Sequence, residues 1–361
     1  MKPLEILKNT KALFFTSSNK LVVSKANKVF LRESDGSLSF LFSFFETRLN
    51  RFLGLFPLLF RMKRLGVMTG ISVKDDYFFT YGKKIHRYNS KNKELIEEYS
   101  FDKGRGPLQF CNVESIKGFD KSVCFGEYFG NHSRNPVKIF QRTESGEWKS
   151  PFQFNHGEIN HVHALIPDIY NQCVWILVGD FEHSAAIYKA TNNFENVELI
   201  IKGKQCYRAC VAFPTKDGLL YATDTQIESN SVRMLVEKNG QWVSKKLIDI
   251  NGSCIYGCEL DDYYIFSTST EPCDKPKNKI YALLDNKPGP GIIKNKSDIV
   301  SYSKTQKTFD VLTSKEKDIF PYRVFQFGTI MFPIGKNTEN LLFAYNVGSK
   351  TNDLSTEIYK I

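Results

Sequence analysis

The feature that most constrains the fold is a recurring unit of short apolar segments separated by turn residues. Segments such as KLVVSK, DYFFTYG, CVWILVGD and GLLYATD have strand length, and segments with the period of a helix are nearly absent. The units begin near residues 66, 110, 159, 206, 254 and 324, and the first four intervals are 44, 49, 47 and 48 residues. Four strands in a period of roughly 40–50 residues predict one blade of a β-propeller.

The whole chain, residues 1–361, is therefore interpreted as a single all-β propeller domain. Six units start from residue 66, and four strand-like segments in 12–44 add another, so we expect seven blades. Six blades is the alternative, and a β-sandwich or two β-domains would also suit such strands. The last segment, TEIYKI, is expected to pair with N-terminal strands. The longest interval contains an insertion rich in Lys, Pro and Gly, CDKPKNKIYALLDNKPGPG.

One segment departs from the repeat. FFETRLNRFLGLFPLLFRMKRLG, residues 44–66, is apolar but carries five cations, Arg48, Arg51, Arg61, Lys63 and Arg64. We expect a short helical insertion between the first two blades, interrupted at Pro57 because proline cannot donate a helical hydrogen bond. Two placements stay open. The insertion packs against the rim of the propeller, or its basic amphipathic surface lies on an anionic membrane.

The composition is compatible with several classes of binding partner. The 49 Lys and Arg against 39 Asp and Glu give a net charge of +10, which suits phosphate, anionic lipid or acidic sugar equally. No strand carries the aromatic and basic pattern typical of RNA binding, so nucleic acid is not expected. Eight scattered cysteines without a CxxC pair, and a start without a signal-peptide pattern, predict a cytoplasmic protein with reduced thiols. The segment 44–66 leaves peripheral attachment to the inner membrane face open.

Repeat geometry predicts where the functional residues gather. In a propeller blade, the loop entering the first strand and the loop leaving the second strand lie on the same face. Polar residues recur at both places, so we predict that they surround one end of the central channel. The entries hold Asn112, His161, His163, Tyr207, Arg208, Tyr256, Tyr322, Arg323 and Gln326, and the exits hold Glu127, Asp180, Asp224 and Glu271. For the acidic residues, capping of turns is the alternative role.

Histidine is concentrated in one part of the chain. Five of the six histidines lie between His132 and His183, and His161 and His163 are spaced to project from the same face of a strand. Three roles stay open for this pair: a hydrogen-bonded channel lining, proton transfer, or a divalent metal site with Asp180 or Glu127. A channel lining and proton transfer would require no cofactor. The predicted catalytic residues are His161, His163, Tyr256, Asp180 and Glu127.

Arg208 follows His163 by 45 residues, about one repeat, which places it in the next blade. An arginine at a channel mouth suits bidentate capture of a carboxylate, and Arg323 is a second candidate. Pairing of Arg208 with Asp180 or Asp224 is the structural alternative. The predicted substrate-binding residues are Arg208, Arg323, Asp224, Asn112, Gln326, Glu271 and His132.

Two turns resemble the Asp-box hairpin, S-x-D-x-G-x-x-W. They are QRTESGEWKSPFQF around Gly146 and VEKNGQWVSKKLI around Gly240, which lie 94 residues apart, and both lack the Asp. KATNNFENVELII is a weaker third copy. Over roughly residues 110–260 the chain therefore resembles the sialidase-like, BNR-repeat propellers, and in particular their uncharacterised bacterial glycosidase-like members.

The resemblance implies action on an acidic sugar or a surface polysaccharide, by hydrolysis or elimination. Arg208 and Arg323 correspond in type to two of the three arginines that bind the carboxylate in sialidases. His161 or His163, with Tyr256 and Arg208, resemble in type the His/Tyr/Arg set of propeller lyases. A non-catalytic propeller that binds a glycan or a protein partner is the alternative, and a nucleotide- or metal-dependent enzyme ranks third.

Overall fold

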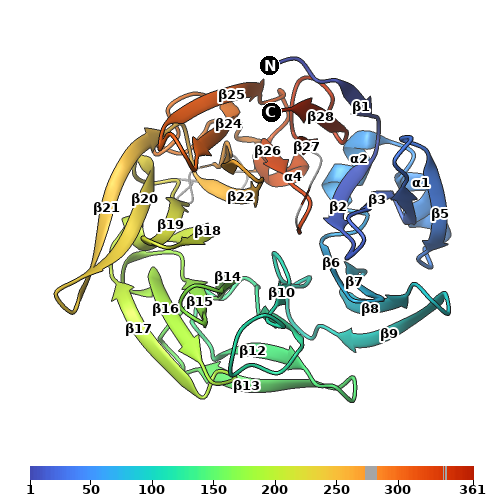
Figure 1. The fold of residues 1–361 in the computed structure, drawn as a ribbon. Coiled ribbons are helices and arrows are strands. Elements are labelled where there is room, and N and C mark those ends of the chain that lie inside the picture. The colour runs from blue at the N-terminus through green and yellow to red at the C-terminus, as the bar shows by residue number, and fades with distance from the viewer. Residues whose placement is uncertain (273–282, 336, 338–339) are drawn as a thin grey trace. The chain divides into compact units, whose positions relative to one another are not determined.

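The computed structural model describes residues 1–272, 283–335, 337 and 340–361. Its strands form seven sheets of four strands each (Figure 1). The chain is therefore a seven-bladed β-propeller, as the repeat predicts, and the six-bladed and β-sandwich alternatives are wrong. Most of the insertion before the last repeat, including Cys273, lies outside the described residues. None of the seven described cysteines forms a disulfide.

The chain divides into two compact units. The first unit consists of Met1–Val67, Gln226–Asn230 and Ile250–Ile361, and the second of Met68–Thr225 and Ser231–Asp249. Each unit is described below by itself.

The first unit holds three sheets, whose strands are given in pairing order. They are β2 (Lys11–Phe15), β3 (Leu21–Lys25), β4 (Lys28–Arg32) and β5 (Leu38–Ser43); β22 (Cys254–Glu259), β23 (Tyr263–Thr268), β24 (Lys296–Ser303) and β25 (Phe309–Glu316); and β26 (Thr329–Met331), β27 (Leu341–Val347), β28 (Thr356–Lys360) and β1 (Glu5–Leu7). Among its described residues, the unit also contains the short helices α1 (Arg48–Leu53), α2 (Pro57–Lys63) and α4 (Tyr322–Phe325).

The second unit holds four sheets in consecutive order. They are β6 (Gly70–Val73), β7 (Asp76–Tyr81), β8 (Lys84–Asn89) and β9 (Glu94–Ser100); β10 (Cys111–Asn112), β11 (Val123–Gly126), β12 (Val137–Arg142) and β13 (Trp148–Phe154); β14 (Val162–Asp168), β15 (Cys173–Val178), β16 (Ala186–Thr191) and β17 (Asn196–Lys202); and β18 (Ala209–Thr215), β19 (Gly218–Thr223), β20 (Asn230–Lys238) and β21 (Gln241–Ile250). Two 3₁₀ turns, Glu182–Ser184 and Gln205–Tyr207, precede β16 and β18.

The last sheet combines both ends of the chain. Strand β1 pairs with β28 in antiparallel register, with Glu5 opposite Ile358 and Leu7 opposite Thr356. The predicted pairing of TEIYKI with an N-terminal strand is therefore confirmed. The segment 12–44 forms the sheet β2–β5, which is also as predicted.

Strand β15 shows how apolar contact joins neighbouring blades in the second unit. All six of its residues are buried. Val174 and Ile176 belong to an apolar cluster shared with β10–β13, whereas Trp175 and Leu177 belong to a cluster shared with β18 and β19. Alternate side chains of a strand point to opposite faces, so each face of this sheet packs against a different neighbour. Because neighbouring blades cover both faces of β15, all of its side chains are apolar, and polar side chains lie only near the ends of the strand.

Two residues explain the close approach of these strands. A Cβ atom on Gly126 would lie 2.3 Å from the Val162 side chain, so only glycine lets β11 come this near to β14. Asp168 ends β14 and is fully buried. Its carboxylate accepts hydrogen bonds from the Tyr170 and Asn171 backbone N–H groups and from Trp175 Nε1, which shapes the turn into β15.

The segment 44–66 is helical, as predicted. It contains α1 and α2, and its apolar side chains Phe45, Leu49, Phe52 and Leu55 are exposed. None of the helices in the described ranges is long and apolar enough to cross a bilayer.

Arg61 differs from the expectation that all five cations of this segment form an exposed basic surface. Its side chain is only 1% exposed. The guanidinium contacts Asp318, lies 3.0 Å from Asp353 Oδ2, and donates to the Phe325 carbonyl oxygen. Arg61 therefore joins α2 to the segments before β26 and before β28, whereas Lys63 and Arg64 are exposed.

Replacement of Arg61 tests this structural role. Arg61→Ala would remove the cation that pairs with Asp353 and one of the two cations that contact Asp318, the other being Lys317. We therefore expect a loss of about 3–5 kcal/mol in the free energy of unfolding. Urea unfolding monitored by circular dichroism measures it. Lys63→Ala, on the same helix but exposed, is the matched control and should change stability by less than about 0.5 kcal/mol. Equal stability of the two variants would contradict the assignment.

Candidate functional site

A repeated backbone hydrogen bond defines the register of the site. The Gly179 N–H donates to the His161 carbonyl oxygen (3.2 Å), and in the next blade the Asp224 N–H donates to the Arg208 carbonyl oxygen (2.9 Å). His161 and Arg208 are thus equivalent positions, each just before the first strand of its blade. The predicted equivalence of Arg208 and His163 is wrong by two residues, and the residue equivalent to His163 is Cys210.

The first strands of both blades begin with a β-bulge. In β14 the pairing jumps from Val162 to Ala164, and in β18 it jumps from Ala209 to Val211. The extra residue is His163 in one blade and Cys210 in the other. Bulges re-aim side chains at strand ends and are frequent beside functional sites. Because the bulge has the same place in both blades, equivalent residues are 47 residues apart, which is also the interval between the unit starts near 159 and 206. The interval of 45 residues from His163 to Arg208 departs from this repeat.

The turn after β15 directs Asp180 toward the histidines. Gly179 has φ +84°, and a Cβ atom there would lie 1.5 Å from the Ser184 carbonyl oxygen. No other residue fits this position without moving the backbone. The chain reverses at Gly179, and the next residue presents its carboxylate to the strand entry.

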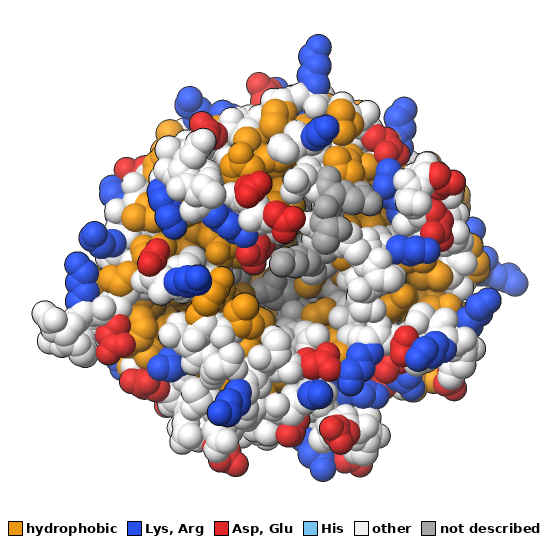
Figure 2. All heavy atoms as spheres, viewed as in Figure 1, with side chains coloured by type: hydrophobic (Ala, Val, Ile, Leu, Met, Phe, Trp, Pro, Cys, Tyr) orange, Lys and Arg blue, Asp and Glu red, His pale blue; other side chains and the backbone are white. Residues whose placement is uncertain are grey.

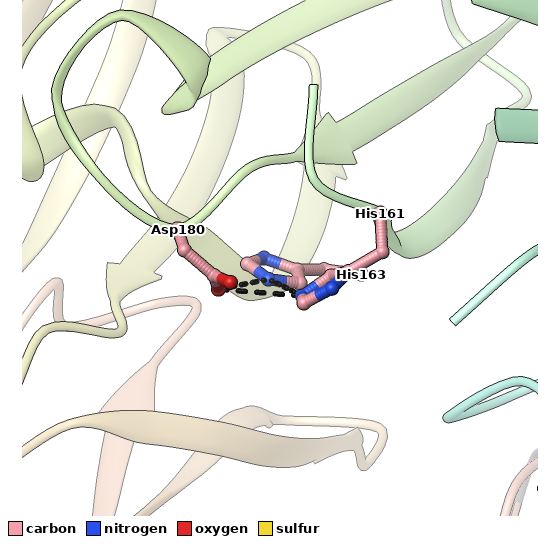
Figure 3. Close-up of side chains that lie close together, drawn as sticks. All are labelled: His161, His163 and Asp180. Carbon is pink, nitrogen blue, oxygen red and sulfur yellow. Dashed lines mark hydrogen bonds and ion pairs between the residues drawn. The ribbon is translucent and has the colours of Figure 1, made fainter. Parts of the chain in front are cut away.

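The structure brings His161, His163 and Asp180 together, as predicted (Figure 3). The two Nε2 atoms of the histidines lie 3.0 Å apart. Asp180 Oδ1 lies 3.3 Å from Nε2 of His161 and 3.5 Å from Nε2 of His163. Three potential donor atoms therefore converge on one point.

The other ring nitrogens face backbone carbonyls. His161 Nδ1 lies 3.1 Å from the Phe129 carbonyl oxygen, and His163 Nδ1 lies 2.9 Å from the Ala209 carbonyl oxygen. Because a carbonyl oxygen only accepts, each Nδ1 must carry the hydrogen. In a neutral imidazole the Nε2 atom then presents a lone pair to the other two donors.

Arg208 lies between two carboxylates. Its Nη2 is 3.4 Å from Asp180 Oδ1, and its Nε is 3.5 Å from Asp224 Oδ2. The Cys210 thiol donates to the same Asp224 oxygen over 3.1 Å. The guanidinium also lies over the Phe181 ring, 5.4 Å from its centroid. The two negative charges exceed the single positive charge of Arg208, so the cluster favours one more cation.

Most of this cluster is buried. His163 is 3% exposed and Arg208 6%, whereas the Asp180 side chain is 22% exposed and provides the contact with solvent. Burial lowers the pKa of His163. For Asp180, burial by itself would raise the pKa, and the positive charge of Arg208 opposes this and favours the ionised carboxylate.

A pocket of about 270 Å³ lies in the same unit. Its walls include Tyr99, Phe101, Phe125 and Tyr128, together with the charged residues Asp102, Lys103, Glu127 and Lys138. The ring of Tyr128 connects this pocket to the cluster, since its centroid lies 4.3 Å from that of His161. On the face seen in Figure 2, basic and acidic side chains alternate and form no single basic field.

Glu127 is the predicted catalytic residue that lines this pocket. It follows β11 directly, and its Oε2 accepts a 2.7 Å hydrogen bond from the Lys138 N–H. Burial raises the pKa of Glu127 above its ordinary value of 4.5, and the charge of Asp102 adds to this, although the Lys138 hydrogen bond and the nearby lysines oppose it. A carboxyl with a raised pKa is a suitable proton donor near neutral pH.

The pocket residues other than Glu127 were missed from the sequence. Asp102 and Lys103 come from FDKGRGP, the loop between β9 and β10, and Lys138 lies on β12. These residues lie neither at the entry of a first strand nor at the exit of a second strand, the two places where repeat geometry predicts site residues. The two glycines of the loop were the available signal, because a Cβ atom on Gly104 would lie 2.5 Å from the Tyr128 carbonyl oxygen.

The remaining predicted residues have other surroundings. In the second unit, Asn112 Oδ1 accepts from the Glu114 N–H, and His132 is exposed in a turn. In the first unit, Tyr256 packs beside a buried apolar cluster, and Glu271 accepts from Ser253 Oγ.

The expectation that Tyr322, Arg323 and Gln326 enter a first strand is wrong. Tyr322 and Arg323 lie in helix α4, and β26 begins only at Thr329. The Tyr322 hydroxyl donates to Asn295 Oδ1, and Gln326 Nε2 donates to the Arg61 carbonyl oxygen. Tyr322 and Gln326 therefore take part in the packing of the first unit.

Comparison with known proteins confirms the fold. No family model matches the sequence, and no curated protein is significantly similar to it. A chain in the crystal structure of the mitotic checkpoint complex aligns with 100% of this chain and 94% of its own length, at 9% identity and a TM-score of 0.57. The AfRom2 CNH domain aligns with 99% of this chain and 95% of its own length, at 8% identity and a TM-score of 0.51.

An oligogalacturonate lyase from Vibrio parahaemolyticus aligns with 92% of this chain and 89% of its own length, at 11% identity and a TM-score of 0.49. Identities this low concern the fold alone. The function has to be argued from the site.

The histidine tautomers can be tested directly. We expect the Nδ1 atoms of His161 and His163 to be protonated, because each faces a carbonyl oxygen. Long-range ¹H–¹⁵N NMR correlations of the two rings distinguish the tautomers. A neutral ring protonated at Nε2 would contradict the assigned geometry. His132, which is exposed, serves as the internal reference for a ring in solvent.

Proposed function

We propose that this chain binds an acidic carbohydrate in the pocket beside Glu127 and cleaves it with Glu127 as the proton donor. The observation that supports this most is the composition of the pocket: aromatic rings, two lysines and a carboxyl group with a raised pKa line one hollow. Its volume of about 270 Å³ is near the lower end of the roughly 300–1,000 Å³ of small-molecule sites. Such a volume suits one or two sugar rings of a longer chain.

Each part of the pocket has a defined task in this proposal. The rings of Tyr99 and Tyr128 supply apolar surface for a sugar face. Lys103 and Lys138 attract the sugar carboxylate, because both are exposed ammonium groups. Glu127 donates a proton to the leaving oxygen as the glycosidic C–O bond breaks. Asp102, the second carboxylate of the pocket, takes a proton from the water that bonds to the anomeric carbon, since glycoside hydrolysis commonly uses two carboxylates.

Arg208 takes a different role from the one that the sequence suggested. Its guanidinium already lies between Asp180 and Asp224 and is 6% exposed. An incoming sugar carboxylate would have to replace one of these partners. We therefore propose that Lys103 and Lys138 bind the anion and that Arg208 positions Asp180.

Three variants test the proposal with a panel of uronate-containing oligosaccharides. Lys103→Ala and Lys138→Ala each remove a charged partner, so each should weaken binding about tenfold, measured by calorimetry. Glu127→Gln should keep binding but lower turnover by about 10²–10⁴-fold. Lys149→Ala, an exposed lysine outside the pocket, is the control and should bind as the unmodified chain does.

The pH dependence follows from the raised pKa. Glu127 donates a proton only in its protonated form, so turnover should fall as the pH rises through its pKa, while binding persists. If acidic and neutral oligosaccharides bind equally weakly, the proposal is wrong. Binding that is retained without any turnover, unchanged in Glu127→Gln, would support the non-catalytic alternative.

The segment 44–66 supports a second proposal, attachment to an anionic membrane surface. Leu49, Phe52 and Leu55 are exposed on or beside α1, with Arg51 exposed on the same helix. The acidic residue of the segment, Glu46, is buried. Exposed apolar groups flanked by cations are typical of segments that lie in the interface of a bilayer.

Vesicle flotation tests the membrane proposal with phosphatidylglycerol and phosphatidylcholine vesicles. We expect binding to the anionic vesicles that falls about tenfold or more in Lys63→Glu/Arg64→Glu, since each cation near such a surface contributes about 1 kcal/mol. Arg61 is left unchanged because it is buried. Lys238→Glu/Lys245→Glu, a pair of exposed cations elsewhere, is the charge-matched control. Equal loss in both variants would show a general charge effect and reject a specific surface.

A further inference from the structure

We infer that His161, His163 and Asp180 bind one divalent transition-metal ion of the zinc type through Nε2, Nε2 and Oδ1. This inference concerns the buried cluster and stands apart from the proposed carbohydrate pocket. It depends on the tautomers, the donor distances and the charge of the cluster.

The tautomers leave three lone pairs facing one another. Each Nδ1 hydrogen points to a backbone carbonyl, of Phe129 for His161 and of Ala209 for His163. The two Nε2 atoms, 3.0 Å apart, then have no hydrogen to share, and Asp180 Oδ1 adds a negative oxygen. Such an arrangement is unfavourable until a positive species lies between the three atoms. A bound metal ion supplies that charge.

The distances match a single coordinated ion. The three donor atoms are separated by 3.0, 3.3 and 3.5 Å. Zinc binds imidazole nitrogen and carboxylate oxygen at about 2.0–2.2 Å, and a point at about that distance from all three donors lies just outside their plane. The side chains already point to it without rotation (Figure 3).

The surroundings hold the donors in place. Histidines that bind metal ions usually donate their other N–H to a carbonyl or carboxylate, which fixes the ring and raises its basicity. Both histidines do so here. Asp180 is held by Arg208 and through its backbone carbonyl, which accepts from Gln205 Nε2 over 3.1 Å.

The charge of the cluster also favours a cation. Asp180 and Asp224 carry two negative charges against the one positive charge of Arg208. Asp224 is 3% exposed, and its Oδ1 has no hydrogen-bond partner among the described residues. A divalent ion beside Arg208 is therefore balanced by the two carboxylates.

The donor types select the kind of ion. Two imidazoles and one carboxylate suit zinc or divalent iron, whereas calcium and magnesium require oxygen ligands. Three protein donors leave a coordination position open. In zinc proteins, an open position of this kind holds water or a substrate oxygen, and closed four-ligand sites are structural. The part-exposed Asp180 gives that position access to solvent.

A second group of donors, His163, Cys210 and Asp224, lies nearby. It shares His163, whose Nδ1 faces the Ala209 carbonyl and whose Nε2 faces His161. Neither nitrogen is directed at Cys210, and the thiol already donates to Asp224. The first group is therefore the site that we assign.

Metal binding to the full chain tests the inference without any carbohydrate. After chelator treatment, the chain should bind one equivalent of Zn²⁺ in calorimetry, and its melting temperature should rise with Zn²⁺ concentration. His163→Ala and Asp180→Asn should each weaken binding at least tenfold. His132→Ala and His156→Ala, which remove exposed histidines, are the matched controls and should bind as the unmodified chain does.

Substitution with Co²⁺ locates the ion even if a variant fails to fold. We expect the unmodified chain to show the visible bands of cobalt bound by nitrogen and oxygen, unchanged in Cys210→Ser. A thiolate charge-transfer band that disappears in Cys210→Ser would place the ion at the second group and overturn the assignment. If the unmodified chain binds no stoichiometric metal, the assignment is also wrong. An additional proton on one imidazole would then lie between the donor atoms in place of the metal ion. Loss of metal binding with carbohydrate binding intact separates this inference from the proposed function.

Discussion

Contact between neighbouring sheets is the constraint on which the rest of this structure depends. A four-stranded blade of the second unit has two apolar faces and cannot bury both by itself. Strand β15 shows the solution, because its alternate side chains enter two different apolar clusters, one shared with the preceding blade and one with the next. The repeat period, the apolar strands and the close approach at Gly126 all serve this packing.

The same constraint explains where the polar residues gather. Strands buried on both faces admit charged groups only at their ends, and a buried charge must find a partner there. His161, His163, Asp180, Arg208 and Asp224 meet this requirement by contacting one another. Arg208 contacts both carboxylates, which leaves one negative charge of the cluster unbalanced and Arg208 engaged. Lys103 and Lys138 differ in this respect, because they line the pocket and are exposed to solvent.

The cations of segment 44–66 have different surroundings, and its composition does not show which of them are buried. Arg61 is a structural ion-pair partner, because it is buried against Asp318 and Asp353. Lys63 and Arg64 on the same segment are exposed, as are the apolar residues of α1. The sequence pattern treats all these cations alike, and only burial distinguishes an anchoring arginine from a surface one.

The sequence by itself predicted the propeller and favoured seven blades, because the period of the apolar segments can be counted along the chain without a related sequence. The six-bladed alternative was excluded only by the seven sheets of the structure. The sequence also singled out His161, His163, Asp180, Arg208 and Asp224 as neighbours, since the repeat places equivalent positions side by side. It did not show the β-bulges that contain His163 and Cys210, because alternation along a strand gives no signal for them. Nor did it show the ring nitrogens facing carbonyls, the burial of Arg61, or the pocket around Glu127. Those depend on atoms brought together from different blades and loops, and only the tertiary structure decides such contacts.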